Sequence, residues 1–219
     1  NDYQITPGQP TNESSIAALN SIKTAANDLK EGVLDGLVTA PISKEHIKKI
    51  QPDFIGHTEL FTNLFPDTES LMFLVSDRVR TATLTGHIPL NKVAENLSRK
   101  KIVAKTKILI KSLEKDFNII KPRIALLGLN PHASDNGAIG TEEQEFIIPA
   151  IQALKDSDYL IYGPYPADGF FGAGTFNKFD AVLGMYHDQV LTPFKTIAFN
   201  DGVNFTAGLP VVRTSPDHG

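Results

Sequence analysis

The chain contains no cysteine among its 219 residues, no tryptophan and only two methionines. The absence of cysteine excludes disulfide bonds, thiolate zinc sites and cysteine nucleophiles. Histidine and carboxylate side chains therefore remain as the available ligands for a metal ion. Internal repeats and low-complexity segments are also absent from the sequence.

The sequence also lacks a strong excess of charge of either sign and has no long apolar run. The formal net charge is −4, so no global field draws the chain to nucleic acid or to an anionic membrane. Every apolar run is far shorter than the roughly 20 residues that a membrane helix needs. With 41% hydrophobic and 21% charged residues, the composition is that of an ordinary globular protein. We expect a cytoplasmic location, with neither nucleic acid nor membrane as a partner.

Apolar runs typical of strands alternate with helical patterns along the chain. Helices are predicted over 11–31, from 43, from 58, over 90–117 with a break near 98, and from 141. Strands are predicted over 37–40, 70–75, 79–85, 123–129, 160–162, 203–206 and 211–214, and in the apolar run within 179–189. Residues 141–144 match a capping box, Pro149 should kink the helix that follows, and a loop is expected through Gly174. Such alternation predicts an α/β fold with a mostly parallel sheet.

Three of the predicted strands run directly into a histidine. His87, His132 and His187 each follow the end of such a strand within a few residues. Ligands of open α/β sheets lie at the carboxyl ends of the strands. Neutral imidazoles are good ligands for zinc and similar ions, and three of them leave a position open for substrate. A capping role for each histidine and a shared metal site are about equally favoured at this point.

Other polar segments allow two interpretations each. The turn-rich segment 130–137 precedes a helix start, which suits an anion, but an ordinary loop has the same composition. Glycines in 169–174 are in the wrong order for a dinucleotide loop, so we reject a Rossmann site. Lys195 and Arg213 lie near the last predicted strands, with Asn204 between them in the sequence. They could bind a phosphate or carboxylate, or they could be ordinary charged residues of a solvated surface.

Six collinear segments resemble a known family, the 4-hydroxythreonine-4-phosphate dehydrogenases of pyridoxal phosphate biosynthesis. They are 38–44 (VTAPISK), 56–59 (GHTE), 129–133 (LNPHA), 185–189 (MYHDQ), 202–204 (GVN) and 208–219 (GLPVVRTSPDHG). The resemblance runs from about Leu37 to Gly219. Two positions depart from the usual pattern: Gly169 replaces a frequent Thr, and Asp135 replaces a more usual Glu.

This resemblance implies an isocitrate/isopropylmalate-dehydrogenase-like fold with two α/β/α domains, mostly parallel sheets and an interdomain cleft. Family members extend beyond both ends of this sequence, so the chain is expected to be truncated at both ends. Residues 1–50 and 198–219 would be remnants of the NAD-side domain. Residues 51–197 would form the second α/β domain, with the metal site and the dimer contacts.

The implied reaction is the oxidation of 4-phosphooxy-L-threonine by NAD (or NADP), followed by decarboxylation to 3-amino-2-oxopropyl phosphate. The resemblance implies a divalent metal, zinc first and magnesium or cobalt otherwise. It also implies site residues of three kinds: metal ligands His87, His132 and His187; substrate contacts His57, Thr58, Lys195, Asn204 and Arg213; and catalytic residues Asp168, Asp188 and Lys195.

A homodimer with a shared active site is implied as well, in which His187 comes from one subunit and His87 and His132 come from the other. Three alternatives stay open. One is a paralogue that oxidises 4-phospho-D-threonate or 4-phospho-D-erythronate, the second is a His-ligated zinc hydrolase, and the third is a metal-stabilised module without catalysis.

Overall fold

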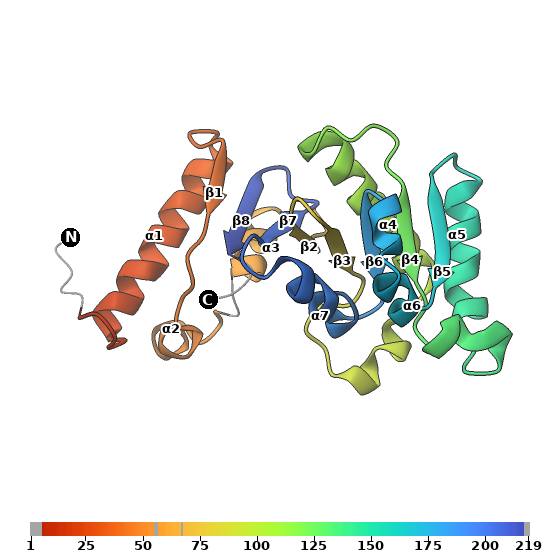
Figure 1. Ribbon diagram of the computed structural model, residues 1–219. Coiled ribbons are helices and arrows are strands. Elements are labelled where there is room, and N and C mark those ends of the chain that lie inside the picture. The colour runs from red at the N-terminus through yellow and green to blue at the C-terminus, as the bar shows by residue number, and fades with distance from the viewer. Residues whose placement is uncertain (1–5, 55–56, 67, 217–219) are drawn as a thin grey trace. The chain divides into compact units, whose positions relative to one another are not determined.

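A computed structural model describes residues 6–54, 57–66 and 68–216, without the side chains of 57–59 and 62. Its helices are α1 (Asn12–Lys30), α2 (Lys44–Ile50), α3 (His57–Leu64), α4 (Arg99–Asp116), α5 (Ile148–Lys155), α6 (Ala167–Gly172) and α7 (His187–Ala198). Its strands are β1 (Gly36–Val38), β2 (Leu71–Val75), β3 (Arg80–Thr83), β4 (Ile124–Leu127), β5 (Ile161–Tyr165), β6 (Ala181–Gly184), β7 (Val203–Ala207) and β8 (Val212–Pro216). Figure 1 shows these elements along the chain.

The chain divides into two compact units. The first comprises Asn1–Ser70 with Leu209–Gly219, and the second comprises Leu71–Gly208. In the first unit β1 and β8 pair in parallel. Helix α3 belongs to this unit because Phe61 packs in one apolar cluster with Ala26 and Leu29 of α1. The change of unit therefore falls after α3, further along the chain than the expected boundary at residue 51.

In the second unit six strands form a sheet in the order β7-β2-β3-β6-β4-β5. The pairs β3·β6, β6·β4 and β4·β5 are parallel, whereas β2 pairs antiparallel with both β3 and β7. The predicted α/β class with a mostly parallel sheet is confirmed.

Helices cover both faces of this sheet, because the side chains of each strand alternate between the faces. Ile124 and Leu126 of β4 belong to the apolar cluster that contains α4 and α5. Ala125 and Leu127 belong to the opposite cluster, with α6 and α7. The central strands therefore lie between two layers of helices.

Two sequence expectations fail in this unit. The stretch expected as a loop through Gly174 contains α6, which is stabilised by packing of Phe170 against Tyr165 and Phe179, with ring centroids 5.1 and 5.7 Å away. The capping box at 141–144 is not formed. Instead Glu142 accepts a hydrogen bond from the N–H of Thr141, and a π-helical turn, Glu143–Ile147, leads into α5.

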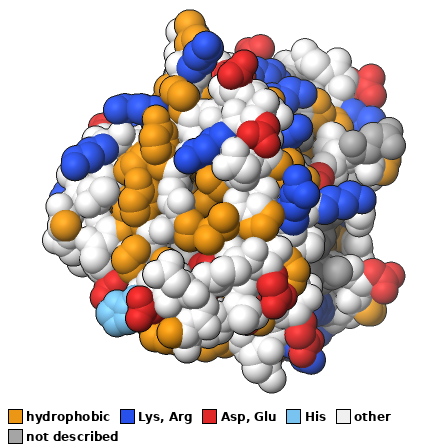
Figure 2. Space-filling model, turned by 90° about the vertical axis from the view of Figure 1, so that its right-hand side faces the viewer, with side chains coloured by type: hydrophobic (Ala, Val, Ile, Leu, Met, Phe, Trp, Pro, Cys, Tyr) orange, Lys and Arg blue, Asp and Glu red, His pale blue; other side chains and the backbone are white. Residues whose placement is uncertain are grey.

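The edge strand β5 presents apolar side chains to solvent. Tyr162 on β5 is 37% exposed, Leu160 directly before the strand is 38% exposed, and Ile148 on α5 is 44% exposed. Figure 2, which views the molecule from this side, shows apolar side chains in a band between charged ones. No helix in the described part of the chain is long and apolar enough to cross a membrane.

Candidate functional site

The three strand-end histidines follow three adjacent parallel strands of the second unit. His87 comes after β3, His187 after β6 and His132 after β4, and β6 lies between the other two. The carboxyl ends of parallel strands meet at one edge of the sheet. The strand-end positions predicted from the sequence are therefore confirmed, although the strands end one or two residues earlier than expected.

Hydrogen bonds continue between β3 and β6 beyond the strands themselves. Leu84 donates to the carbonyl of Gly184 at 2.8 Å, and the Thr85 hydroxyl donates to the carbonyl of Met185 at 2.7 Å. The chain segments thus stay side by side up to the histidines. As a result the rings of His87 and His187 are in contact, with centroids 5.1 Å apart and planes tilted by 48°.

His187 is oriented by the residue next to it. Its Nδ1 lies 2.6 Å from Oδ1 of Asp188, whose carboxylate accepts a hydrogen bond from a protonated Nδ1. In the neutral ring this arrangement leaves the lone pair on Nε2. A carboxylate on the far nitrogen is the usual companion of a metal-binding imidazole.

The spacing of the two rings fits a shared metal ion. Two imidazoles that bind one tetrahedral zinc at about 2.0–2.1 Å have ring centroids about 5 Å apart. The observed 5.1 Å matches this distance. The donor chemistry also fits, because imidazoles are good zinc ligands and the Asp188 contact leaves the lone pair of His187 on Nε2.

His132 is placed differently. It begins a run of five residues with positive φ, His132 to Asn136, with φ between 45° and 68°. For residues other than glycine this left-handed conformation costs roughly 1–2 kcal/mol each. Within the described residues no group of three histidine, aspartate or glutamate side chains is arranged to hold a metal ion. One chain therefore brings together two of the three expected ligands.

The sequence did not predict two buried polar side chains that lie behind the loops carrying His132 and His187. Glu143 is fully buried and accepts hydrogen bonds from the backbone of Leu129 and Asn130. Gln189, at the start of α7, accepts from the Met185 N–H and donates to the Gly128 carbonyl. Neither a Glu at a helix start nor a Gln near a histidine indicates a buried role from sequence alone, because both residue types are common on exposed surfaces.

A close approach explains the glycine after β4. A Cβ at Gly128 would lie 2.9 Å from Cα of Ala133 and 3.0 Å from Oε1 of Glu143. Nearby, the Asn130 amide donates to Glu142 and, with backbone hydrogen bonds, lowers the pKa of that carboxyl despite its partial burial. The loop that carries His132 is therefore packed directly on the start of the π-helical turn.

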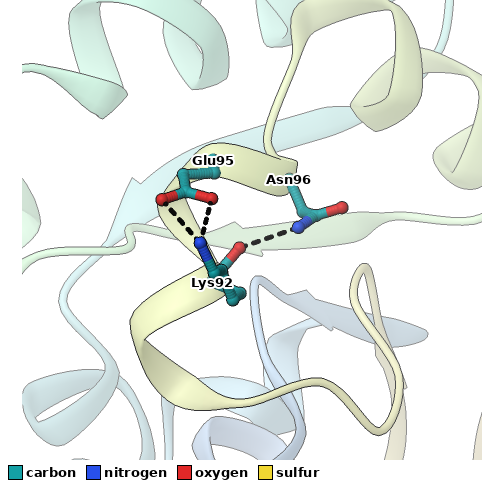
Figure 3. Close-up of polar contacts among 3 residues, drawn as sticks. All are labelled: Lys92, Glu95 and Asn96. Atoms are coloured by element: carbon teal, nitrogen blue, oxygen red, sulfur yellow. Dashed lines mark hydrogen bonds and ion pairs between the residues drawn. The ribbon is translucent and has the colours of Figure 1, made fainter.

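The segment after His87 is held by local contacts on the surface. Lys92 forms an ion pair with Glu95 at 2.9 Å, and the Asn96 side chain donates to the carbonyl of Lys92 (Figure 3). Exposed ion pairs of this kind contribute little to stability. They lie within the two short helical turns between β3 and α4, Leu90–Lys92 and Ala94–Asn96.

The predicted catalytic carboxylates line one cavity. Asp168 from α6 and Asp188 from α7 both face a space of about 500 Å³. Its other walls come from the same two helices: Ala167, Phe171, Gly172, Gln189, Thr192, Pro193, Thr196 and Ile197. This mostly apolar, open cavity with two exposed carboxylates lies next to the oriented His187 and is a candidate small-molecule site.

The predicted substrate contacts are divided between the two units. Lys195, half-buried on α7, and Asn204, half-buried on β7, belong to the second unit. Arg213 belongs to the first unit, where it is only 3% exposed. His57 and Thr58 begin α3 in the first unit, and their side chains lie outside the described residues.

Arg213 is a buried cation. It donates to the Thr39 hydroxyl at 2.6 Å, and its guanidinium carbon lies 5.9 Å from the centre of the Phe61 ring. Burial lowers the pKa of Arg213 from its ordinary value. A desolvated guanidinium gains more from an anion than an exposed one does.

Several known proteins are similar to this chain over nearly all of its length. The chain is 46% identical over 219 residues to 4-hydroxythreonine-4-phosphate dehydrogenase of Bacteroides thetaiotaomicron, covering the whole chain and 60% of the relative. It is 44% identical to the protein of that name from Prosthecochloris aestuarii, covering 98% of the chain and 64% of the relative. The crystal structure of the enzyme of that name from Klebsiella pneumoniae matches with a TM-score of 0.87 and 35% identity, over 98% of the chain and 65% of that structure.

The fold and the site define an α/β protein with a histidine-rich strand edge beside a carboxylate-lined cavity. The family model described as "Pyridoxal phosphate biosynthetic protein PdxA" matches residues 1–219. The chain therefore belongs to the PdxA family. It spans about 60–64% of the length of the two curated relatives just named.

Proposed function

We propose that the complete protein is a cytoplasmic 4-hydroxythreonine-4-phosphate dehydrogenase. It oxidises the secondary alcohol of 4-phosphooxy-L-threonine, with hydride transfer to NAD or NADP, and the resulting β-keto acid loses carbon dioxide to give 3-amino-2-oxopropyl phosphate. The observation that carries this proposal is the contact between His87 and His187, with Asp188 fixing the tautomer of His187. Membership of the PdxA family and the names of the relatives support the same reaction.

His87, His132 and His187 are the proposed ligands of a divalent metal, with zinc the best match to three imidazoles and magnesium or cobalt as alternatives. A metal bound there supplies Lewis-acid stabilisation of negative charge on the oxygen of the substrate. The ring spacing of 5.1 Å and the carboxylate on Nδ1 support this assignment for two of the ligands.

The chain's own carboxylates have two different proposed tasks. Asp188 keeps the proton of His187 on Nδ1, so that Nε2 remains free to bind. Asp168 is assigned as the group that accepts the proton of the substrate hydroxyl. Its position on the wall of the cavity that Asp188 also lines supports this role.

Lys195, Asn204, Arg213, His57 and Thr58 are the proposed contacts of the phosphorylated acid. Lysine and arginine suit a phosphate because charge-assisted hydrogen bonds to anions are the strong ones. Lys195 is also assigned a catalytic role, since its ammonium group can donate a proton to the carbon that loses carbon dioxide. The partial desolvation of Arg213 supports its use as an anion ligand.

A homodimer with a shared site completes the proposal. The resemblance divides the ligands as His187 from one subunit and His87 with His132 from the other, whereas the ring contact pairs His87 with His187 within one chain, so that His132 would come from the partner. A two-fold dimer would supply the third ligand to each of two equivalent sites.

Turnover by the complete chain tests the proposed reaction. NADH formation and carbon dioxide release are measured with 4-phosphooxy-L-threonine, 4-phospho-D-threonate and 4-phospho-D-erythronate as substrates. The proposal predicts the highest kcat/KM for the first compound, with both products in equal amounts. A preference for one of the other acids would reassign the substrate. Phosphate release without NADH would indicate a hydrolase.

A further inference from the structure

A buried carboxylate outside the predicted set of site residues supports the loop that carries His132. Glu143 has 0% exposure, and its Oε1 accepts hydrogen bonds of 2.7 Å from the N–H groups of both Leu129 and Asn130. Its Oε2 accepts a further bond of 2.9 Å from the Asn130 side chain. A buried carboxylate is retained only where such donors compensate its desolvation.

The loop held by Glu143 needs external support. Five successive residues from His132 onward have left-handed backbone angles, a conformation that L-residues avoid. Neighbouring residues of the π-helical turn and its start add further bonds: Glu142 accepts from Asn130, and the Gln144 amide pairs with the Ser134 hydroxyl. Strained backbone persists where the surrounding structure determines it, and it is frequent at functional sites.

The same buried network reaches the helix of His187. Gln189 Nε2 donates to the Gly128 carbonyl at 2.6 Å, and Gln189 Oε1 accepts from the Met185 N–H at 2.7 Å. Gly128 directly precedes Leu129, whose N–H donates to Glu143. A continuous set of buried and part-buried hydrogen bonds therefore runs from the start of α7 through the residues after β4 to Glu143.

We propose that Glu143 is a positioning residue for His132. It fixes the backbone immediately before His132 relative to the strand edge that carries His187. This inference rests on the proposed metal site, and it adds that one buried carboxylate sets the conformation of the strained loop that supplies His132 to that site. Metal ligands require such support, because loss of an outer contact typically weakens metal binding by about 10–100-fold.

Substitution of Glu143 by Gln in the complete protein tests the inference. The amide has nearly the same shape, but it places a donor against donors, so at least one of the three hydrogen bonds is lost. Glu145→Gln is the matched control, because Glu145 is an exposed residue in the same π-helical turn. Two properties are measured: zinc affinity by competition with a chelator, and amide hydrogen exchange across residues 129–136.

We expect Glu143→Gln to weaken zinc binding by about 10–100-fold and to accelerate exchange in 129–136, with activity restored by excess zinc. Glu145→Gln should change neither property. A lower melting temperature with unchanged zinc affinity would show a purely structural role and overturn the inference, as would unchanged exchange. Failure of the unsubstituted protein to bind zinc would instead overturn the proposed metal site itself.

Discussion

The Thr85 hydroxyl donates to the carbonyl oxygen of Met185 at 2.7 Å, and each of these residues stands two positions before a histidine. The bond keeps the segments after β3 and β6 together where strand pairing has ended. His87 and His187 consequently meet with ring centroids 5.1 Å apart. The site thus depends on hydrogen bonds to backbone carbonyls made by residues outside the predicted set of site residues.

Replacement of His132 by Ala should abolish both bound metal and turnover in the complete protein, because two imidazoles alone hold zinc far more weakly than three. Metal content is measured by elemental analysis after gel filtration. His46→Ala is the control, since His46 lies in α2 of the first unit, where it is bonded to Ser43. Full metal content in the His132 variant would remove this residue from the ligand set.

Asp188→Asn should weaken metal binding by about 10–100-fold, as expected for loss of a carboxylate on a ligating imidazole. The amide is a weaker acceptor for the proton on Nδ1 and permits the other tautomer. Zinc affinity is measured by chelator competition, with Asp201→Asn as an exposed control. Equal affinities in the two variants would contradict the assigned role of Asp188.

Lys195→Ala and Arg213→Ala should each raise KM for the phosphorylated substrate by roughly 10–100-fold, the scale of a lost charge-assisted hydrogen bond. Arg213 is buried, so its variant is also expected to unfold at a lower temperature, whereas the half-buried Lys195 should show the KM effect with little loss of stability. Steady-state kinetics and thermal unfolding are measured on the same samples. An unchanged KM would exclude the residue from phosphate binding.

Subunit mixing tests the shared site. Inactive His→Ala variants at positions 87, 132 and 187 are mixed in the three pairs. About half of the dimers then contain one subunit of each variant. If the two substituted histidines belong to opposite subunits of a site, each mixed dimer keeps one intact site, which restores about a quarter of full activity. The resemblance predicts recovery for positions 87 and 187. The ring contact within one chain instead favours recovery only in pairs with position 132. No recovery in any pair, despite proven exchange, would contradict a shared site.

The strand-end histidines could be predicted because apolar runs that stop at a polar residue have a direct physical meaning. A buried strand needs apolar side chains on both faces, and its carboxyl end is where the chain becomes polar again. Beyond the strands, the Thr85 hydroxyl donates a hydrogen bond to the Met185 carbonyl and so extends the pairing, and a sequence pattern does not reveal such a bond.

Helix α6 and the role of Glu143 could not be predicted, because tertiary contacts override local signals there. Two glycines within α6 favour a loop, but Phe170 packs on aromatic rings from β5 and the segment before β6. Residues 141–144 match a capping box, yet Glu143 turns inward to bind the backbone after β4. The left-handed run from His132 is likewise determined by its surroundings, since His, Asp and Asn tolerate this conformation as single residues but a run of five is disfavoured.

The most direct test of the metal site is anomalous diffraction at the zinc edge from crystals of the complete protein loaded with zinc. We predict one anomalous peak per site, about 2.0–2.1 Å from a ring nitrogen of His87, His132 and His187, with Nε2 as the ligating atom of His187. Crystals of the His132→Ala variant should lack the peak. A peak elsewhere, or full occupancy without contact to these histidines, would contradict the account.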